Sequence, residues 1–185
     1  MLRSLRRSVG MLAARFRYRK SREKVISFSH ALPEAESVLI ILPLWPAAGA
    51  DHLVLLAPYR ARFEEGHMTV VTTLSRDSFE RLLPRSRVIT IAPDEVNPFF
   101  LPRQVVIDRV HARQYDLAVD LNLDFILPSG YICRESHARI RAGFANPHAD
   151  TFYNFQVRLD PDSHRGNAYE RLAHCLTMFF AEEGV

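Results

Sequence analysis

Short apolar runs alternate with helix-like segments along most of this chain, and this alternation restricts the fold more than any other feature of the sequence. Four runs are rich in aliphatic and β-branched residues: 38–42, 68–74, 88–92 and 117–121. The first, VLIIL, is apolar at every position, which is typical of a strand covered on both faces. Helical patterns fill the intervals, so the sequence predicts an α/β sandwich with a mostly parallel sheet.

The remaining segments complete a three-layer, Rossmann-like arrangement of about five or six strands. We expect a helix from Asp51 to about residue 65, kinked at Pro58, and a linker over residues 27–36. We also expect a short helix that is capped by Ser75 or Asp77 and ends at Leu83. Further helices are expected over 104–113, 125–136 and 167–182, with a short strand over 140–143 and an edge strand over 153–159. A length of 185 residues supports one such domain, residues 37–185, preceded by a basic arm and linker, residues 1–36.

Positive charge is concentrated in the arm. Residues 1–24 hold nine of the 24 basic residues and one acid, Glu23, whereas the rest of the chain has more acidic than basic groups. The body therefore offers no general basic face, and nucleic acid is not an expected partner. Apolar residues recur between the arginines at near-helical spacing, which suits a helix on an anionic membrane surface, a helix docked on the domain, or an organelle transit peptide. No apolar run approaches the roughly 20 residues that a membrane span needs.

Neither cysteines nor histidines predict a metal site. Cys133 and Cys175 are far apart and outside any CxxC motif, which indicates free thiols in a reducing compartment. The histidines show no HxxxH or HxH spacing.

Polar residues follow two of the predicted strands, where a parallel sheet places its ligands. Asn122 and Asp124 follow the strand 117–121, and they either bind a ligand or complete a turn. Asp51 and His52 follow the first strand: Asp51 can act as a general base or cap the next helix, and His52 can share the proton. Asp120, inside the strand, is better suited to be a buried hydrogen-bond partner.

Two further side chains complete the set of candidate ligand contacts. Arg76 follows the second strand and can contact an anion, or simply face water. Trp45 lies in a Pro-rich loop, where it can stack on a ring or cover the core. Arg139 and Arg141 alternate along a strand, which predicts a shared solvated face.

Three stretches, in their order and spacing, resemble glycosyltransferase family 9, the ADP-heptose:lipopolysaccharide heptosyltransferases. VLIILP with the following GADHLVLLAPYRARFEE resembles the family's first strand, Gly-Asp turn and helix. YDLAVDLN and RIRAGF resemble two later strands, so that the likeness covers about residues 37–145. Members fold as two Rossmann-like domains facing a cleft, the GT-B architecture, with the acceptor held by the N-terminal domain.

The resemblance implies a function in glycosyl transfer, but one part of the site that this reaction needs is missing from the sequence. By the order of glycine and acid, Asp51 matches the family's base; by the position of Pro58, His52 does. No Gly-rich diphosphate loop is present among only seven glycines, and no cofactor is implied. We therefore expect an acceptor-side domain that takes a sugar or glycolipid and needs a nucleotide-sugar-binding partner chain for any glycosyl transfer. It would serve lipopolysaccharide or cell-envelope glycan assembly in the cytoplasm, peripheral to the inner membrane face. The alternative is a non-catalytic interaction or small-ligand module that keeps only the fold.

Overall fold

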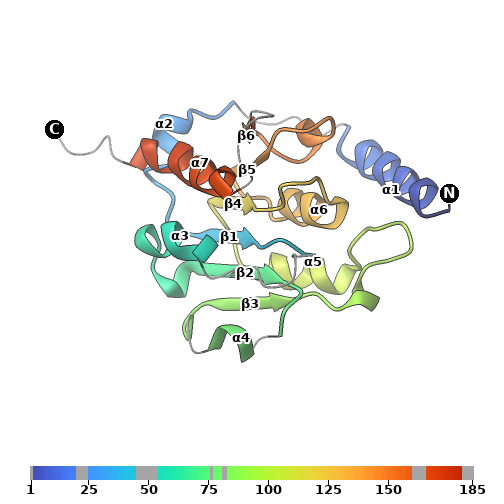
Figure 1. Ribbon diagram of the computed structural model, residues 1–185, viewed down its shortest axis with the longest axis horizontal. Coiled ribbons are helices and arrows are strands. Elements are labelled where there is room, and N and C mark those ends of the chain that lie inside the picture. The colour runs from blue at the N-terminus through green and yellow to red at the C-terminus, as the bar shows by residue number, and fades with distance from the viewer. Residues whose placement is uncertain are drawn as a thin grey trace.

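The computed structural model describes residues 2–19, 25–44, 54–75, 77–80, 83–159 and 166–180. Six strands form one sheet in the order β3-β2-β1-β4-β5-β6, and every strand pair is parallel (Figure 1). The strands are β1 (Val38–Ile41), β2 (Met68–Thr72), β3 (Arg87–Thr90), β4 (Leu117–Asp120), β5 (Ile140–Phe144) and β6 (Phe155–Val157). The α/β fold with a parallel sheet is thereby confirmed.

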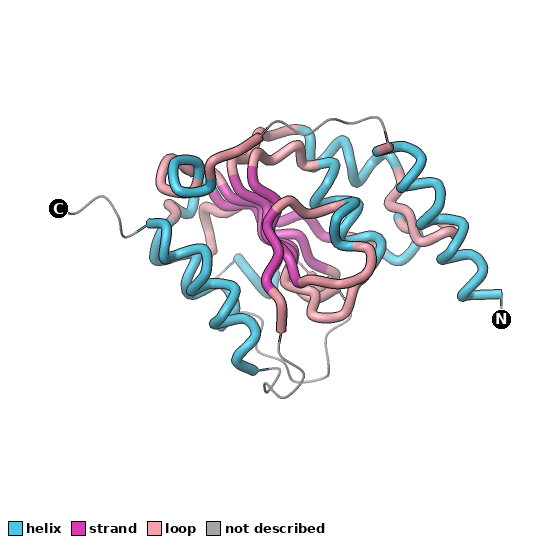
Figure 2. The backbone as a smooth tube through the Cα atoms, turned by 90° about the horizontal axis from the view of Figure 1, so that it is seen from above, coloured by secondary structure: helices cyan, strands magenta, loops and turns pink. Residues whose placement is uncertain are grey.

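Helices cover both faces of this sheet, so that the fold has three layers (Figure 2). They are α1 (Leu2–Tyr18), α2 (Phe28–Ala31), α3 (Ala57–Arg62), α4 (Asp77–Glu80), α5 (Gln104–His111), α6 (Leu127–Glu135) and α7 (Gly166–Thr177). Single 3-10 turns lie at Val54–Leu56, Glu65–His67, Pro93–Glu95, Ala149–Thr151 and Met178–Phe180. Of the helices described, none is long and apolar enough to cross a bilayer.

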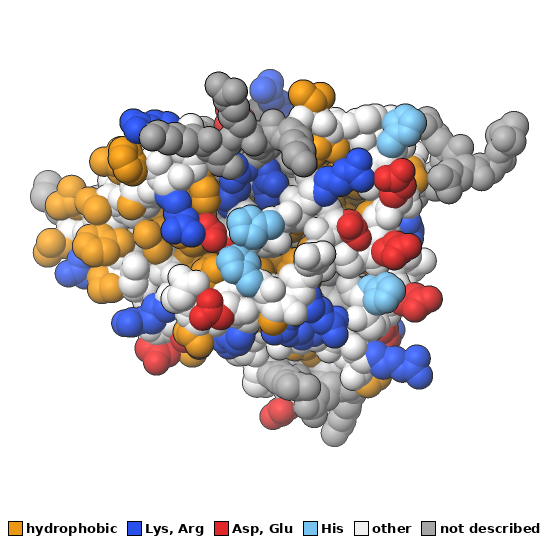
Figure 3. Space-filling model, turned by 180° about the vertical axis from the view of Figure 1, so that it is seen from behind, with side chains coloured by type: hydrophobic (Ala, Val, Ile, Leu, Met, Phe, Trp, Pro, Cys, Tyr) orange, Lys and Arg blue, Asp and Glu red, His pale blue; other side chains and the backbone are white. Residues whose placement is uncertain are grey.

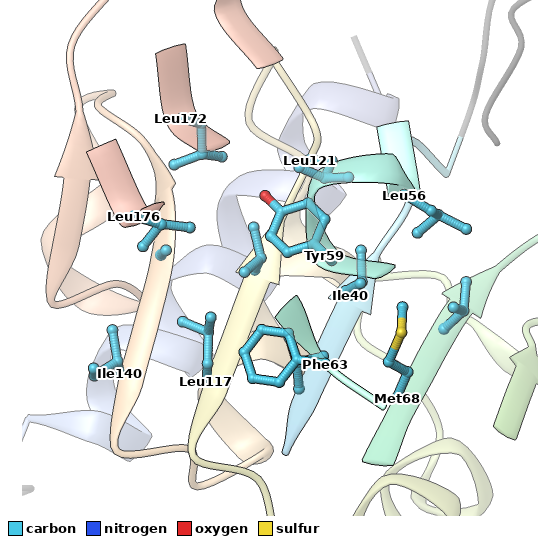
Figure 4. Close-up of a cluster of buried hydrophobic side chains, with 14 of the residues drawn as sticks. Ile40, Leu56, Tyr59, Phe63, Met68, Leu117, Leu121, Ile140, Leu172 and Leu176 are labelled. Atoms are coloured by element: carbon cyan, nitrogen blue, oxygen red, sulfur yellow. The ribbon is translucent and has the colours of Figure 1, made fainter. Parts of the chain in front are cut away.

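The central strand β1 is apolar throughout because both of its faces are buried. Along β1, Ile40 and its alternate neighbours point to the face covered by α3 and α7, where Tyr59 and Leu172 pack (Figure 4). Leu39 and Ile41 point to the opposite face, under α5 and α6. The all-apolar VLIIL run is thus explained by two separate hydrophobic clusters, one on each side of the sheet.

Three local expectations were wrong. The expected linker contains α2, which places Ala31 and Leu32 in the core. Pro58 lies in the first turn of α3 instead of kinking a longer helix, because the missing amide hydrogen is not needed there. Arg141 is buried on β5, where its guanidinium donates to the backbone oxygens of Phe152 and Ala138 at 3.1 and 2.9 Å.

Candidate functional site at the carboxyl edge of the sheet

Chain order reverses between β1 and β4, which is where an open parallel sheet presents its ligand crevice. Asn122, just past β4, bridges this point. Its side-chain oxygen accepts from the Leu44 amide at 3.0 Å, and its nitrogen donates to the Leu42 carbonyl at 3.3 Å. The side chain therefore fixes the chain leaving β1 against the end of β4, and its amide is occupied by the protein itself.

Beneath Asn122 lies a buried carboxylate, Asp120, which is 1% exposed. It accepts from the side-chain nitrogen of Asn122 at 2.6 Å and from the Tyr153 hydroxyl at 2.6 Å. Burial raises the pKa of Asp120, and the hydrogen bonds from Tyr153 and Asn122 partly oppose that rise. Its role is to organise the switch point, as expected for an acid inside a strand.

The raised pKa of Asp120 predicts how stability depends on pH. The folded protein holds this proton over a range in which the unfolded chain, with a pKa of about 3.9, has lost it. Because the folded state then binds more protons, the free energy of unfolding falls as pH rises through that range. Urea titrations from about pH 4 to about pH 8 measure the free energy of unfolding of the wild type and of Asp120→Asn, and the difference in favour of the wild type should shrink with rising pH. A difference that stays constant or grows would contradict a raised pKa of Asp120.

Two hollows open beside the switch point. The larger, of about 700 Å³, is bordered by Leu44, Thr73 and Ile91, each of which directly follows or lies near the end of a strand. Its other wall is the first turns of α1, with Arg3 and Arg6 at the mouth. The smaller hollow, of about 540 Å³, is shared by Arg3 and Arg7 of α1, Phe100, and the chain entering α6.

Helix α1 reaches this edge because its inner face is built from small or slender residues. Gly10, Met11 and Ala14 are buried, and a Cβ on Gly10 would overlap the backbone oxygen of Phe99. Glycine at this position permits close contact between the helix and the loop after β3.

Polar contacts add to this packing at both ends of α1. Arg7 donates to the Phe125 carbonyl at 2.9 Å, and the Arg3 guanidinium lies 5.7 Å from the Phe100 ring centre. Near the other end, Arg17 pairs with the buried carboxylate of Glu135 through two bonds of 2.9 and 3.2 Å. Burial and the hydrogen bond to Glu135 raise the pKa of Tyr18, so its hydroxyl stays protonated.

The lining of the two hollows suits an anion better than a proton transfer. Arg3 and Arg6 supply positive charge at the mouth, and guanidinium groups match phosphate and carboxylate oxygens. Among the described residues that border either hollow, there is no Asp, Glu or His. This part of the site can bind and orient a charged ligand, while a general base would have to come from elsewhere.

One cluster has metal-ligand chemistry but lies away from the hollows. Ligand atoms of His111, Glu135 and His137 lie within 4.8 Å of one another. The Glu135 carboxylate is already engaged by Arg17 and Tyr18, and Nε2 of His111 is 2.7 Å from the Glu135 backbone oxygen. The Glu135 carboxylate is therefore better explained as the anchor of α1 than as the ligand of a cation.

Only some of the candidates named from the sequence lie within the described part of the chain. Asp51, His52, Trp45 and Arg76 lie outside the described residues. Asn122 is at the predicted edge, and Asp124 is exposed two residues further on. The arginines of α1 were not among the site candidates; Gly10, a lone glycine within a helical pattern, was the one signal of close packing.

Comparison with solved structures supports the fold. The chain superimposes on E. coli heptosyltransferase WaaC with ADP with a TM-score of 0.55 at 18% identity, covering 78% of this chain and 47% of that chain. The chain thus spans about half the length of that enzyme, whose architecture is GT-B, and the likeness at this identity concerns the fold. No protein-family model matches the sequence. No curated protein matches it either.

Proposed function

We propose that this chain is the acceptor-side half of a glycosyltransferase family 9-like system acting in cell-envelope or lipopolysaccharide glycan assembly. It binds a sugar or glycolipid acceptor at the carboxyl edge of the sheet. Transfer then requires a partner chain that holds the nucleotide-sugar. The observation that carries the proposal is the hollow of about 700 Å³ at the ends of β1, β2 and β3, which Arg3 and Arg6 border. The fold around it matches about half of a heptosyltransferase.

The charge at the mouth suggests which acceptors fit. Arg3 borders both hollows, and Arg6 borders the larger one, so an anionic group between them meets two guanidinium groups. Hydrogen bonds to charged groups contribute about 1.5–3 kcal/mol each. An acceptor sugar that carries a phosphate or carboxylate is therefore favoured over a neutral sugar.

Binding of soluble probes tests this proposal. We expect a hexose monophosphate, or a short-chain glycolipid with an acidic sugar, to raise Tm by roughly 5 °C at 100-fold excess over Kd. An ADP-sugar alone should leave Tm unchanged, because the donor site belongs to the partner. Replacing both Arg3 and Arg6 by alanine should weaken acceptor binding by at least about tenfold.

A matched control removes the same charge near the other end of α1, from Arg15 in its last turn and Arg19 just past its end. Arg15→Ala with Arg19→Ala leaves both hollows intact, since neither residue borders them. If both double variants weakened acceptor binding equally, the effect would come from the loss of net positive charge and not from contacts in the hollow. No response to any acidic sugar or glycolipid would reject the acceptor site.

One observation favours the second candidate, a non-catalytic binding or interaction module. The described residues around the hollows lack a proton acceptor of the Asp, Glu or His type, and Asn122 is occupied by backbone partners. This candidate predicts that no mixture with a donor-domain protein transfers sugar. Glycosyl transfer in such a mixture, lost on Asp51→Ala or His52→Ala, would exclude it.

A further inference from the structure

We propose that α1 attaches the protein to anionic membrane surfaces through its solvent-facing side while its inner side remains docked on α6 and the loop after β3. This inference does not depend on the acceptor proposal, because four of the five side chains of its apolar row, those of Leu5, Val9, Leu12 and Phe16, border neither hollow. It rests on three features of α1: an exposed apolar row, arginines on both sides of that row, and a fixed orientation relative to the hollows.

The first feature is a row of large apolar side chains that the fold leaves in water. Their exposed fractions are 71% for Leu2, 62% for Leu5, 44% for Val9, 70% for Leu12 and 67% for Phe16. Hydrophobic side chains gather at the left end of the view in Figure 3, over α1. Scattered exposed leucines are ordinary, but a continuous apolar row marks an interaction surface.

The row lies opposite the docked face. At about 100° per residue, the five positions fall within one sector of roughly 80° on the helix. The buried positions Gly10, Met11 and Ala14 fall on the other side of the helix. Docking therefore does not use the apolar row, and the helix can pack on the domain while its apolar row inserts into a membrane surface.

Arginines border the row on both sides. The same helical projection places Arg6 beside one edge of the row and Arg15, whose guanidinium also contacts the ring of His148, beside the other. The helix contains no acidic residue. Arginines at the edges of an apolar face are the arrangement by which interfacial helices bury their apolar side chains and meet anionic headgroups.

The same charges argue against a second copy of the chain as the occupant. A two-fold contact between two α1 rows would bring arginines of one helix next to arginines of the other. Like charges across an interface are unfavourable, and this helix supplies no acid to offset them. A bilayer with anionic lipids satisfies both the apolar row and its cationic borders.

Membrane attachment through this face would also orient the candidate site. Leu2 and Arg3 belong to the wall of the larger hollow, while the following turns carry the apolar row. A docked α1 lying in the headgroup layer thus places the mouth of that hollow at the membrane surface. A lipid-linked ligand could then enter it without leaving the bilayer.

Vesicle co-sedimentation of the full chain tests the proposal. We expect binding to phosphatidylcholine vesicles with about 30 mol% phosphatidylglycerol at about 0.15 M salt, and much weaker binding to phosphatidylcholine alone. The variant Leu5→Ser, Leu12→Ser, Phe16→Ser should lower the partition coefficient on the order of 100-fold. None of these three residues borders a hollow or belongs to the buried face.

A matched variant controls for general loss of surface hydrophobicity. Val54→Ser, Val105→Ser, Met178→Ser removes three comparably exposed apolar side chains outside α1 and should leave vesicle binding unchanged. Circular dichroism of each variant verifies that the fold is intact. The proposal is overturned if the α1 variant binds vesicles like the wild type. It is also overturned if the wild type ignores vesicles and sediments as a dimer that the α1 substitutions dissociate.

Discussion

Replacing Asp120 by alanine should lower the free energy of unfolding by about 4 kcal/mol, an effect at the upper end for a single substitution. The carboxylate is buried and accepts from the Tyr153 hydroxyl and from both the backbone and side-chain nitrogens of Asn122. Removing it leaves these buried donors unpaired, at about 1–3 kcal/mol each. For a chain of this size, Tm should fall by roughly 10 °C in a thermal melt.

The control is an acid that the fold does not use. Asp94 is exposed in the turn after β3, and Asp94→Ala should change the free energy of unfolding by less than about 0.5 kcal/mol. If Asp120→Ala were as mild as Asp94→Ala, water would be replacing the carboxylate, and the switch point would be open instead of closed. Asn122 would then again be available to a ligand.

The switch point between β1 and β4, where Asn122 and Asp120 are bonded to the protein itself, shows what the sequence could predict and what it could not. The strand 117–121 and its polar successors are visible as a local pattern, so the position of Asn122 at the carboxyl edge was predictable. Its partners Leu42 and Leu44 are about 80 residues away in the chain, and no local pattern connects them. The same limitation hid Arg141, whose alternation with Arg139 suggested water while the fold covers both faces of β5.

Element type was most predictable where periodicity extends over several residues. The helix Gln104–His111 and the strand Met68–Thr72 appear within the ranges expected from their patterns. Helix α2 has four residues, too few for a helical period to emerge, and it forms because Ala31 and Leu32 pack into the core. Tertiary packing, not propensity, decides such short elements.

The arginines around the hollows were hidden for a different reason. The pattern of residues 2–18 correctly indicates an amphipathic helix, but helical periodicity does not identify the surface on which the helix packs. Two of the expected interpretations, docking and surface attachment, use different faces of α1 and do not exclude one another. Gly10 is the residue that distinguishes the inner face, since the backbone of Phe99 leaves no room for a side chain there.

Replacing Gly10 by alanine should therefore destabilise the protein, although helix propensity alone predicts the opposite. Alanine is favoured over glycine by about 1 kcal/mol inside a helix. In the docked helix, however, the new Cβ would overlap the backbone oxygen of Phe99 and lie 3.1 Å from the Leu127 side chain. Since a backbone atom cannot move aside as a side-chain end does, α1 must shift or leave, and Met11 and Ala14 lose their packing. We expect a net loss of about 3 kcal/mol in urea unfolding.

A second readout shows whether the loss comes from undocking. Trypsin should cut the arginine-rich α1 of Gly10→Ala at least about tenfold faster than that of the wild type, because local opening exposes its backbone. Ser8→Ala, on the exposed side of the same helix, gains helix propensity without a clash and should be slightly more stable. If Gly10→Ala behaved like Ser8→Ala, α1 would not be seated against Phe99, and the wall that it gives to both hollows would be lost with it. Destabilisation by Gly10→Ala alone, together with faster cleavage, would place the helix where the acceptor and membrane proposals require it.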